Sequence, residues 1–105
     1  MLPLIRNDFG LNWENNSLSL NGKIYKLPER EFEILAVLLN ELQFISLTDL
    51  KVKVLGRMKA DQVDNTTFIS DIKKLRHSLS SENLPVRILF PGKAKCLLQI
   101  EGSQQ

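Results

Sequence analysis

The chain has 105 residues and a formal net charge of +2, with 43% hydrophobic and 25% charged residues. This length is typical of one domain with one hydrophobic core, so a two-domain organisation is not expected. The longest uninterrupted apolar run, Ile34 to Leu39, is far shorter than the ~20 residues that span a bilayer. We therefore expect a single soluble domain over residues 1–105, with its core over about residues 8–100.

Residues 1–6 have neither the basic and then apolar order nor the small-residue cleavage site of a secretory signal. The single cysteine, Cys96, has no second cysteine with which to form an internal disulfide. Both features predict a cytoplasmic location. They fit a small complete protein and an excised domain of a larger protein equally well.

The reactive side chains argue against catalysis. One histidine, His77, and one cysteine cannot assemble the usual ligands of a zinc site, and the CxxC, HExxH and GxxxxGK[ST] patterns are absent. A Ser-His-Asp triad would have to use His77 with scattered serines, but a polar histidine beside Lys and Arg is more typical of a solvated surface. We expect no enzymatic activity, no metal and no cofactor.

The excess positive charge lies in the last third of the chain. Residues 1–40 hold four basic and five acidic residues, and residues 41–64 hold four of each. Residues 65–105 hold six basic and three acidic residues, which gives this segment a net charge of +3. The asymmetry favours an anionic partner, usually nucleic acid, with a solvated basic surface as the alternative.

The first quarter of the chain predicts a small antiparallel β-meander. Two alternating runs, 17–20 and 23–27, flank Asn21-Gly22, a pair that suits a tight hairpin because both central residues take positive φ. An earlier strand, over about residues 8–13, is separated from them by the turn-like residues 14–16.

A first helix is expected from Pro28, which suits the first turn of a helix and ends the preceding strand. Apolar residues then recur at spacings of three and four and widen into one buried face: Phe32, Ile34, Leu35, Val37, Leu38, Leu39 and Leu42. The glutamates at positions 29, 31 and 33 lie near its positive end, so we interpret them as structural rather than catalytic.

A second helix is expected from Ser46, an N-cap residue with Asp49 three positions further on, to about Gly56. Residues 56–63 are polar and lack periodicity, so we predict a loop there. This loop ends at Asp64, a residue suited to cap a third helix.

The third helix has two different faces. Phe68, Ile72, Leu75 and Leu79 fall within ~60° of one another and form the predicted core face. Half a turn away lies a polar face that is basic in its C-terminal half and consists of Thr66, Ser70, Lys73, Lys74 and His77. A DNA major groove could accept this face, and a solvated helix surface is the alternative.

Residues 80–85 break this helix, and two strand-like runs, 86–90 and about 95–100, surround the turn pair Pro91-Gly92. The resulting hairpin carries Arg87, Lys93 and Lys95. The whole order predicts an α+β winged helix-turn-helix with an N-terminal antiparallel meander, three helices and a C-terminal β-hairpin wing.

Three segments carry a resemblance to a known family: 27–35 (LPEREFEIL), 45–50 (ISLTDL) and the end of the third helix, 72–79 (IKKLRHSL). In this order and spacing, over about residues 8–100, the chain resembles the OmpR/PhoB-type DNA-binding effector domain. The resemblance implies sequence-specific binding of double-stranded DNA in bacterial transcription regulation.

Matched position by position, the resemblance assigns DNA contacts to the third helix and the hairpin. The residues it implicates, together with those on the polar face and at the hairpin tip, are Thr66, Ser70, Lys73, Lys74, Arg76, His77, Lys93 and Lys95. The family often uses the loop before its third helix to contact RNA polymerase, which implies a partner role for Arg57, Met58 and Lys59. Local packing is the alternative for Met58.

The chain also departs from the family pattern. Asp71 stands where the family often has His, and an acid beside phosphate is repelled unless it pairs with a neighbouring Lys or accepts a hydrogen bond from a cytosine amine. The Tyr of the family's wing is missing, and Lys95 is the ungapped match to the wing Arg.

The family's phosphorylation-controlled members also carry a receiver domain, which this sequence lacks. A receiver, sensor or membrane-anchored segment outside the chain is one expected partner, and a winged-helix module that binds protein is the alternative function.

Overall fold

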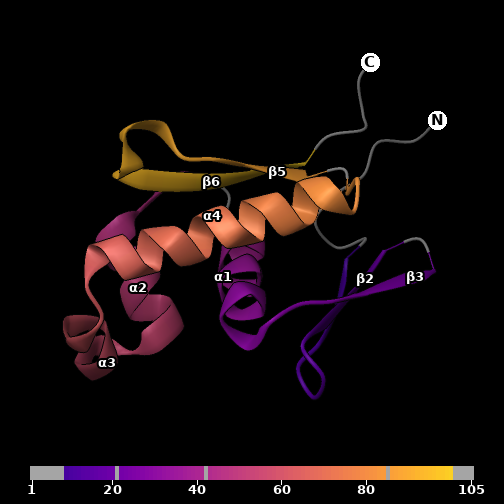
Figure 1. The fold of residues 1–105 in the computed structure, drawn as a ribbon, viewed down its shortest axis with the longest axis horizontal. Helices are drawn as coiled ribbons and strands as arrows, with labels where there is room; N and C mark the ends of the chain where they lie inside the picture. Colours follow the sequence, from indigo (N-terminus) through magenta and orange to yellow (C-terminus); the bar gives the residue numbers. More distant parts are fainter. Residues whose placement is uncertain (1–8, 21, 42, 85, 101–105) are drawn as a thin grey trace.

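The computed structural model describes residues 9–20, 22–41, 43–84 and 86–100. The described residues form two antiparallel sheets, one along the top of the helices and the other at their lower right (Figure 1). The first sheet has the order β1-β2-β3 and consists of β1 (Gly10–Asn12), β2 (Ser17–Leu20) and β3 (Lys23–Lys26). The second has the order β4-β6-β5 and consists of β4 (Ile45–Ser46), β5 (Val86–Leu89) and β6 (Lys95–Ile100).

The α-helices of the described residues are α1 (Glu29–Asn40), α2 (Leu47–Leu55), α3 (Arg57–Gln62) and α4 (Asn65–Ser81). The predicted N-caps are confirmed: the Ser46 hydroxyl accepts from the Asp49 amide at 3.1 Å, and the Asp64 carboxylate accepts from the Thr67 amide at 2.9 Å. Hydrogen bonding to the side chain of Thr67 and, to a lesser degree, to its backbone amide lowers the pKa of Asp64. No helix in the described residues is both long and apolar enough to cross a membrane.

The N-terminal meander is confirmed, with a shorter first strand than expected. β2 and β3 pair with Leu20 opposite Lys23, which leaves a two-residue turn containing Gly22 at a φ of 82°. Asn21, predicted to share that turn, and Asp8, predicted to open the first strand, lie outside the described residues. Leu18 and Leu20 of β2 are buried in the same core cluster as the apolar face of α1.

The loop predicted over residues 56–63 is wrong, because most of it forms the short helix α3. Its residues, including Arg57, Met58 and Ala60, are among the better helix formers, and Gly56 separates it from α2 with a φ of 84°. Six residues are too few to show an apolar period, and only Ala60 is buried. The described residues therefore form four α-helices, one more than the three predicted.

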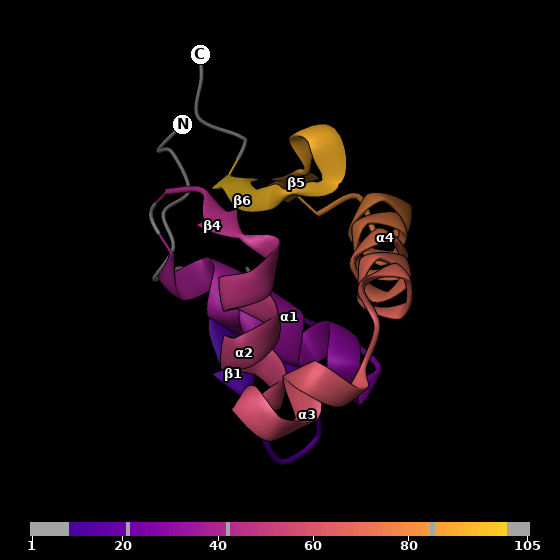
Figure 2. The same cartoon turned by 90° about the vertical axis from the view of Figure 1, so that its left-hand side faces the viewer.

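The predicted phase of α4 is confirmed. Its core face is almost completely inaccessible to water: Phe68 0%, Ile72 1%, Leu75 0% and Leu79 1% exposed. Viewed nearly along its axis, α4 lies on one side of α1 and α2, and the turn of the β5–β6 hairpin projects toward the same side (Figure 2). The packing therefore turns the opposite face of α4 outward, next to the hairpin.

Candidate nucleic-acid interface

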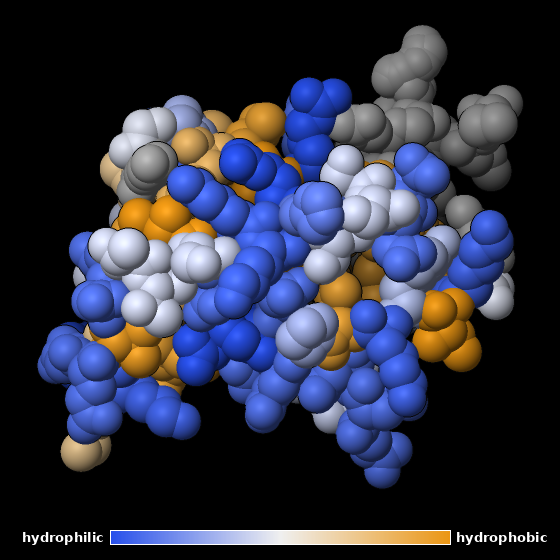
Figure 3. Space-filling view, viewed as in Figure 1, coloured by the Kyte–Doolittle hydropathy of each residue, from blue (hydrophilic) through white to orange (hydrophobic). Residues whose placement is uncertain are grey.

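The outward side of α4 is polar. All six α4 residues predicted as site residues are solvent-exposed: Thr66, Ser70, Lys73, Lys74, Arg76 and His77. A hydrophilic band follows α4 across this side of the molecule (Figure 3). No acidic side chain in the described residues forms an ion pair with Lys73, Lys74 or Arg76. Their positive charges are therefore available to an anionic ligand.

Four of the six predicted residues form one compact strip. At ~100° per residue, Thr66, Ser70, Lys73 and His77 fall within ~60° of one another, opposite the core face. Lys74 and Arg76 lie on the two opposite flanks of this strip. The His77 ring also lies 3.4 Å from the Ser81 hydroxyl and is otherwise exposed.

One residue of this surface, Ile69, is missing from the prediction. A shallow hollow on α4 is lined by Thr66, Ile69, Ser70 and Lys73. Ile69 is half-buried, and its inner side packs against the core. Its spacing, three residues after Thr66 and four before Lys73, is the sequence signal that could have identified it.

The flank of α4 that faces α1 makes two specific polar contacts. The guanidinium of Arg30 lies 3.1 Å from the Asp71 carboxylate, and the Ser78 hydroxyl donates to Glu31 at 2.9 Å. Glu31 is buried and accepts this bond within the interface between α1 and α4. Asp71 thus lies in the interface between α1 and α4 and is already paired.

A further polar contact holds the N-terminal end of α4. Lys51 of α2 is buried, and its ammonium donates to the side-chain oxygen of Asn65 at 3.0 Å. Since Asn65 is the first residue of α4, this bond fixes the start of the helix against α2.

The C-terminal hairpin is confirmed, and its turn, Pro91–Lys93, contains Gly92 at a φ of 64°. The ammonium of Lys95 lies 4.8 Å from the centre of the ring of Phe44, the residue that precedes β4 in the chain. The Lys93 side chain lies outside the described part of the structure. Cys96, the next residue along β6, is buried, and burial raises the pKa of its thiol to about 12, so it stays protonated at neutral pH.

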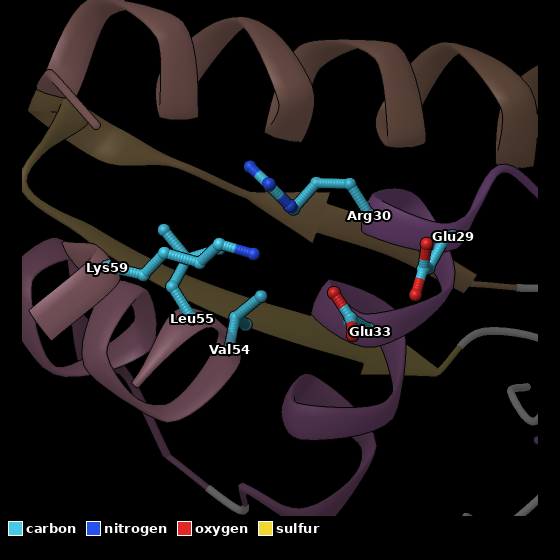
Figure 4. A pocket seen from close by; sticks show the side chains of 6 residues that line it. All are labelled: Glu29, Arg30, Glu33, Val54, Leu55 and Lys59. Atoms are coloured by element: carbon cyan, nitrogen blue, oxygen red, sulfur yellow. The ribbon is translucent and has the colours of Figure 1, made fainter. Parts of the chain in front are cut away.

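The predicted partner residues are exposed on α3: Arg57, Met58 and Lys59. Met58 is 81% exposed, so the alternative of a packing role for it is wrong, and Ala60 anchors the helix instead. Lys59 also reaches from α3 into a hollow of about 220 Å³ in front of α1 (Figure 4). The residues that line this hollow are Glu29, Arg30, Glu33, Val54, Leu55 and Lys59.

The chain matches no known family model, and no curated protein is significantly similar to it in sequence. Among solved structures, it is similar to the DNA-binding domain of E. coli CadC, with a TM-score of 0.69 and 25% identity. The match covers 89% of this chain and 87% of the CadC chain. The likeness and the observed order of sheet, helices and hairpin show that this chain has an α+β winged-helix fold.

Proposed function

We propose that this chain binds double-stranded DNA sequence-specifically in bacterial transcription regulation, with α4 as the recognition helix. The observation that carries the proposal is the exposure of Lys73, Lys74 and Arg76 on a helix whose other side is anchored in the core. A B-DNA major groove is ~12 Å wide and accepts one α-helix. The structural likeness to a domain described as DNA-binding supports the same function.

The outward strip of α4 offers different chemistry to the bases and to the phosphates. The hydroxyls of Thr66 and Ser70 can donate to or accept from either. Lys73 can contact guanine or phosphate, and the apolar Ile69 beside it suits the methyl group of thymine. Lys74 and Arg76, on the two flanks, face the directions in which the phosphate strands would border the groove.

We further propose that the β5–β6 hairpin acts as a wing that attracts phosphate by charge. Its turn projects toward the side of α4 (Figure 2). Lys93 and Lys95 carry flexible point charges, which favour phosphate attraction over discrimination among sequences. Arg57, Met58 and Lys59 on α3 are proposed as a contact for RNA polymerase, because they are exposed outside the α4 surface.

The alternative, a winged-helix module that binds protein only, has two grounds: the modest net charge of +2 and the acid Asp71 in the expected groove-facing helix. The ion pair of Asp71 with Arg30 removes the second ground, since the acid faces α1 and its charge is compensated there. DNA binding is therefore the function that the geometry supports best.

The test compares two double variants with the same change in net charge. Lys73→Ala/Lys74→Ala removes two cations from α4, and Lys23→Ala/Lys26→Ala removes two exposed cations from β3. The DNA is the duplex that the wild type binds most tightly among genomic fragments. We expect the α4 variant to bind it roughly tenfold or more weakly than the wild type. The β3 variant should stay within about threefold of the wild type, since its charges lie outside the interface. Equal affinities for the two variants would contradict the proposal.

A further inference from the structure

Asp71 is the one acidic residue in α4, two positions before Lys73. An unpaired carboxylate at this place would repel the phosphates that the neighbouring lysines attract. Within the structure, however, only 18% of the Asp71 side chain is exposed, and it forms an ion pair with Arg30 of α1 at 3.1 Å. The charge of the acid is therefore compensated from another helix.

Arg30 has other acids within reach on its own helix. Glu29 and Glu33 lie one and three positions away, and both line the same hollow as Arg30. The Arg30 side chain nevertheless extends away from both of these carboxylates, toward α4 (Figure 4). Among the described residues, its ion pair is with Asp71. The pairing is thus a tertiary contact between two helices and differs from an ordinary charge pair along one helix.

A second contact repeats this arrangement two turns further along α4. Ser78, seven residues after Asp71, donates to the buried Glu31, the residue next to Arg30. A spacing of seven residues places Asp71 and Ser78 on the same flank of α4. Two adjacent residues of α1 therefore hold one flank of α4 and fix which side of the helix faces outward.

We propose that Arg30 is a positioning residue for DNA binding: by pairing with Asp71, it holds the one acid of α4 in the α1–α4 interface and leaves the outward side of α4 basic. This inference rests on the proposed function. It assigns to a residue of α1, outside the expected DNA-contacting elements, an effect on affinity that is exerted through Asp71.

The experiment is a charge cycle with a matched control. The variants are Arg30→Gln, Asp71→Asn and the double variant. The control cycle uses Lys53→Gln, Glu41→Gln and their double variant, because Lys53 and Glu41 form the other ion pair of the described residues, at 2.8 Å, outside α4. Each step changes the net charge equally in the two cycles. Affinity for a short labelled duplex of mixed sequence is measured at several salt concentrations, and each variant is also melted thermally.

We expect Arg30→Gln to bind about fivefold more weakly than Lys53→Gln, because it exposes an unpaired acid near the phosphates. Adding Asp71→Asn should restore affinity to within about twofold of the wild type, since the acid is then gone. The excess loss of Arg30→Gln should also narrow as salt rises. A change in folding alone would not produce this salt dependence.

Two results would overturn the inference. The first is equal DNA affinity of Arg30→Gln and Lys53→Gln, which would reduce the effect to net charge. The second is a double variant whose DNA affinity stays as low as that of Arg30→Gln, which would mean that Arg30 contacts DNA directly or only supports the fold. Should Arg30→Gln alone not fold, the double variant still decides: about a fivefold loss in it would contradict the role of Asp71. A wild-type protein that binds no duplex would instead refute the proposed function itself.

Discussion

α4 and the β5–β6 hairpin both carry lysines expected to meet DNA, but the two elements hold them differently. Lys73 and Lys74 are exposed and make no ion pair within the described residues. The ammonium of Lys95, in contrast, lies over the ring of Phe44 at 4.8 Å. Lys95 is therefore less available to a phosphate than Lys73 or Lys74.

The energetic difference between the two elements is modest. A cation–π contact at a partly exposed site stabilises by about 0.5–1 kcal/mol, and Phe44 is 39% exposed. Lys95 would have to give up this contact to reach a phosphate on the side of α4. We therefore expect α4 to supply most of the affinity and the hairpin to add a smaller, sequence-independent share.

The comparison of α4 with the hairpin depends first on the packing of α4 against the core. Phe68 is fully buried beneath the outward strip, so Phe68→Ala should lower the free energy of unfolding by about 3–5 kcal/mol. Met58→Ala, at a site that is 81% exposed, should change it by no more than about 0.5 kcal/mol. Thermal or urea denaturation measures both. An intact melting temperature combined with lost DNA binding in Phe68→Ala would mean that this ring faces the DNA.

The difference between α4 and the hairpin should appear in single substitutions. Lys73→Ala should weaken binding by about 1–3 kcal/mol if it contacts a base, or reduce the salt slope by about 1 if it contacts only phosphate. Lys95→Ala should cost less than about 1 kcal/mol, because Phe44 already engages its charge.

The hairpin as a whole can then be tested with Lys93→Ala/Lys95→Ala, titrated against a selected and a scrambled duplex. The two affinities should fall by similar factors, and the salt slope should flatten by about 1 to 2. A loss confined to the selected duplex would show that the hairpin reads bases. No loss on either duplex would leave it as a solvated turn.

On α4, the apolar Ile69 beside the outward strip predicts a base preference. If Ile69 meets a thymine methyl group, replacing the contacted thymine with uracil should weaken the wild type by about 1 kcal/mol. The same replacement should not affect Ile69→Ala, which has already lost the contact. Equal sensitivity of the two proteins to uracil would remove Ile69 from the readout.

The smallest effect on DNA binding is expected at α3. Charge reversal at Arg57 and Lys59, both exposed on α3, should leave the affinity for the selected duplex within about threefold of the wild type. Transcription from a promoter carrying that sequence should change if α3 contacts RNA polymerase. If DNA affinity and transcription fell by the same factor, α3 would contact DNA instead.

Local signals predicted most of the fold. The caps of α2 and α4 depend on residues three positions apart, and the core face of α4 on spacings of three and four, so both could be read from the sequence. The helix α3 and the two-residue strand β4 are too short to produce a periodic pattern. β4 is defined only by its pairing with β6, about fifty residues later in the chain.

In the candidate site, too, local features were predictable and long-range contacts were not. The helix period predicted that the α4 cations are exposed, but it could not predict which residues pair with the charged groups. Arg30 and Asp71 are 41 positions apart, and Lys95 and Phe44 belong to different elements, so both contacts arise from tertiary packing. The sequence suggested a neighbouring Lys or a cytosine amine as the partner of Asp71, whereas the fold pairs it with Arg30 of α1.

The central claim, that the outward side of α4 is the DNA surface, is tested most directly by an NMR titration of the assigned backbone amides with a selected duplex. We predict that the largest shifts fall at Thr66, Ser70, Lys73 and His77, with smaller shifts in the hairpin turn 91–94 and little change in β1–β3. Shifts that cluster on α3 or on the N-terminal sheet, with α4 unchanged, would contradict the account.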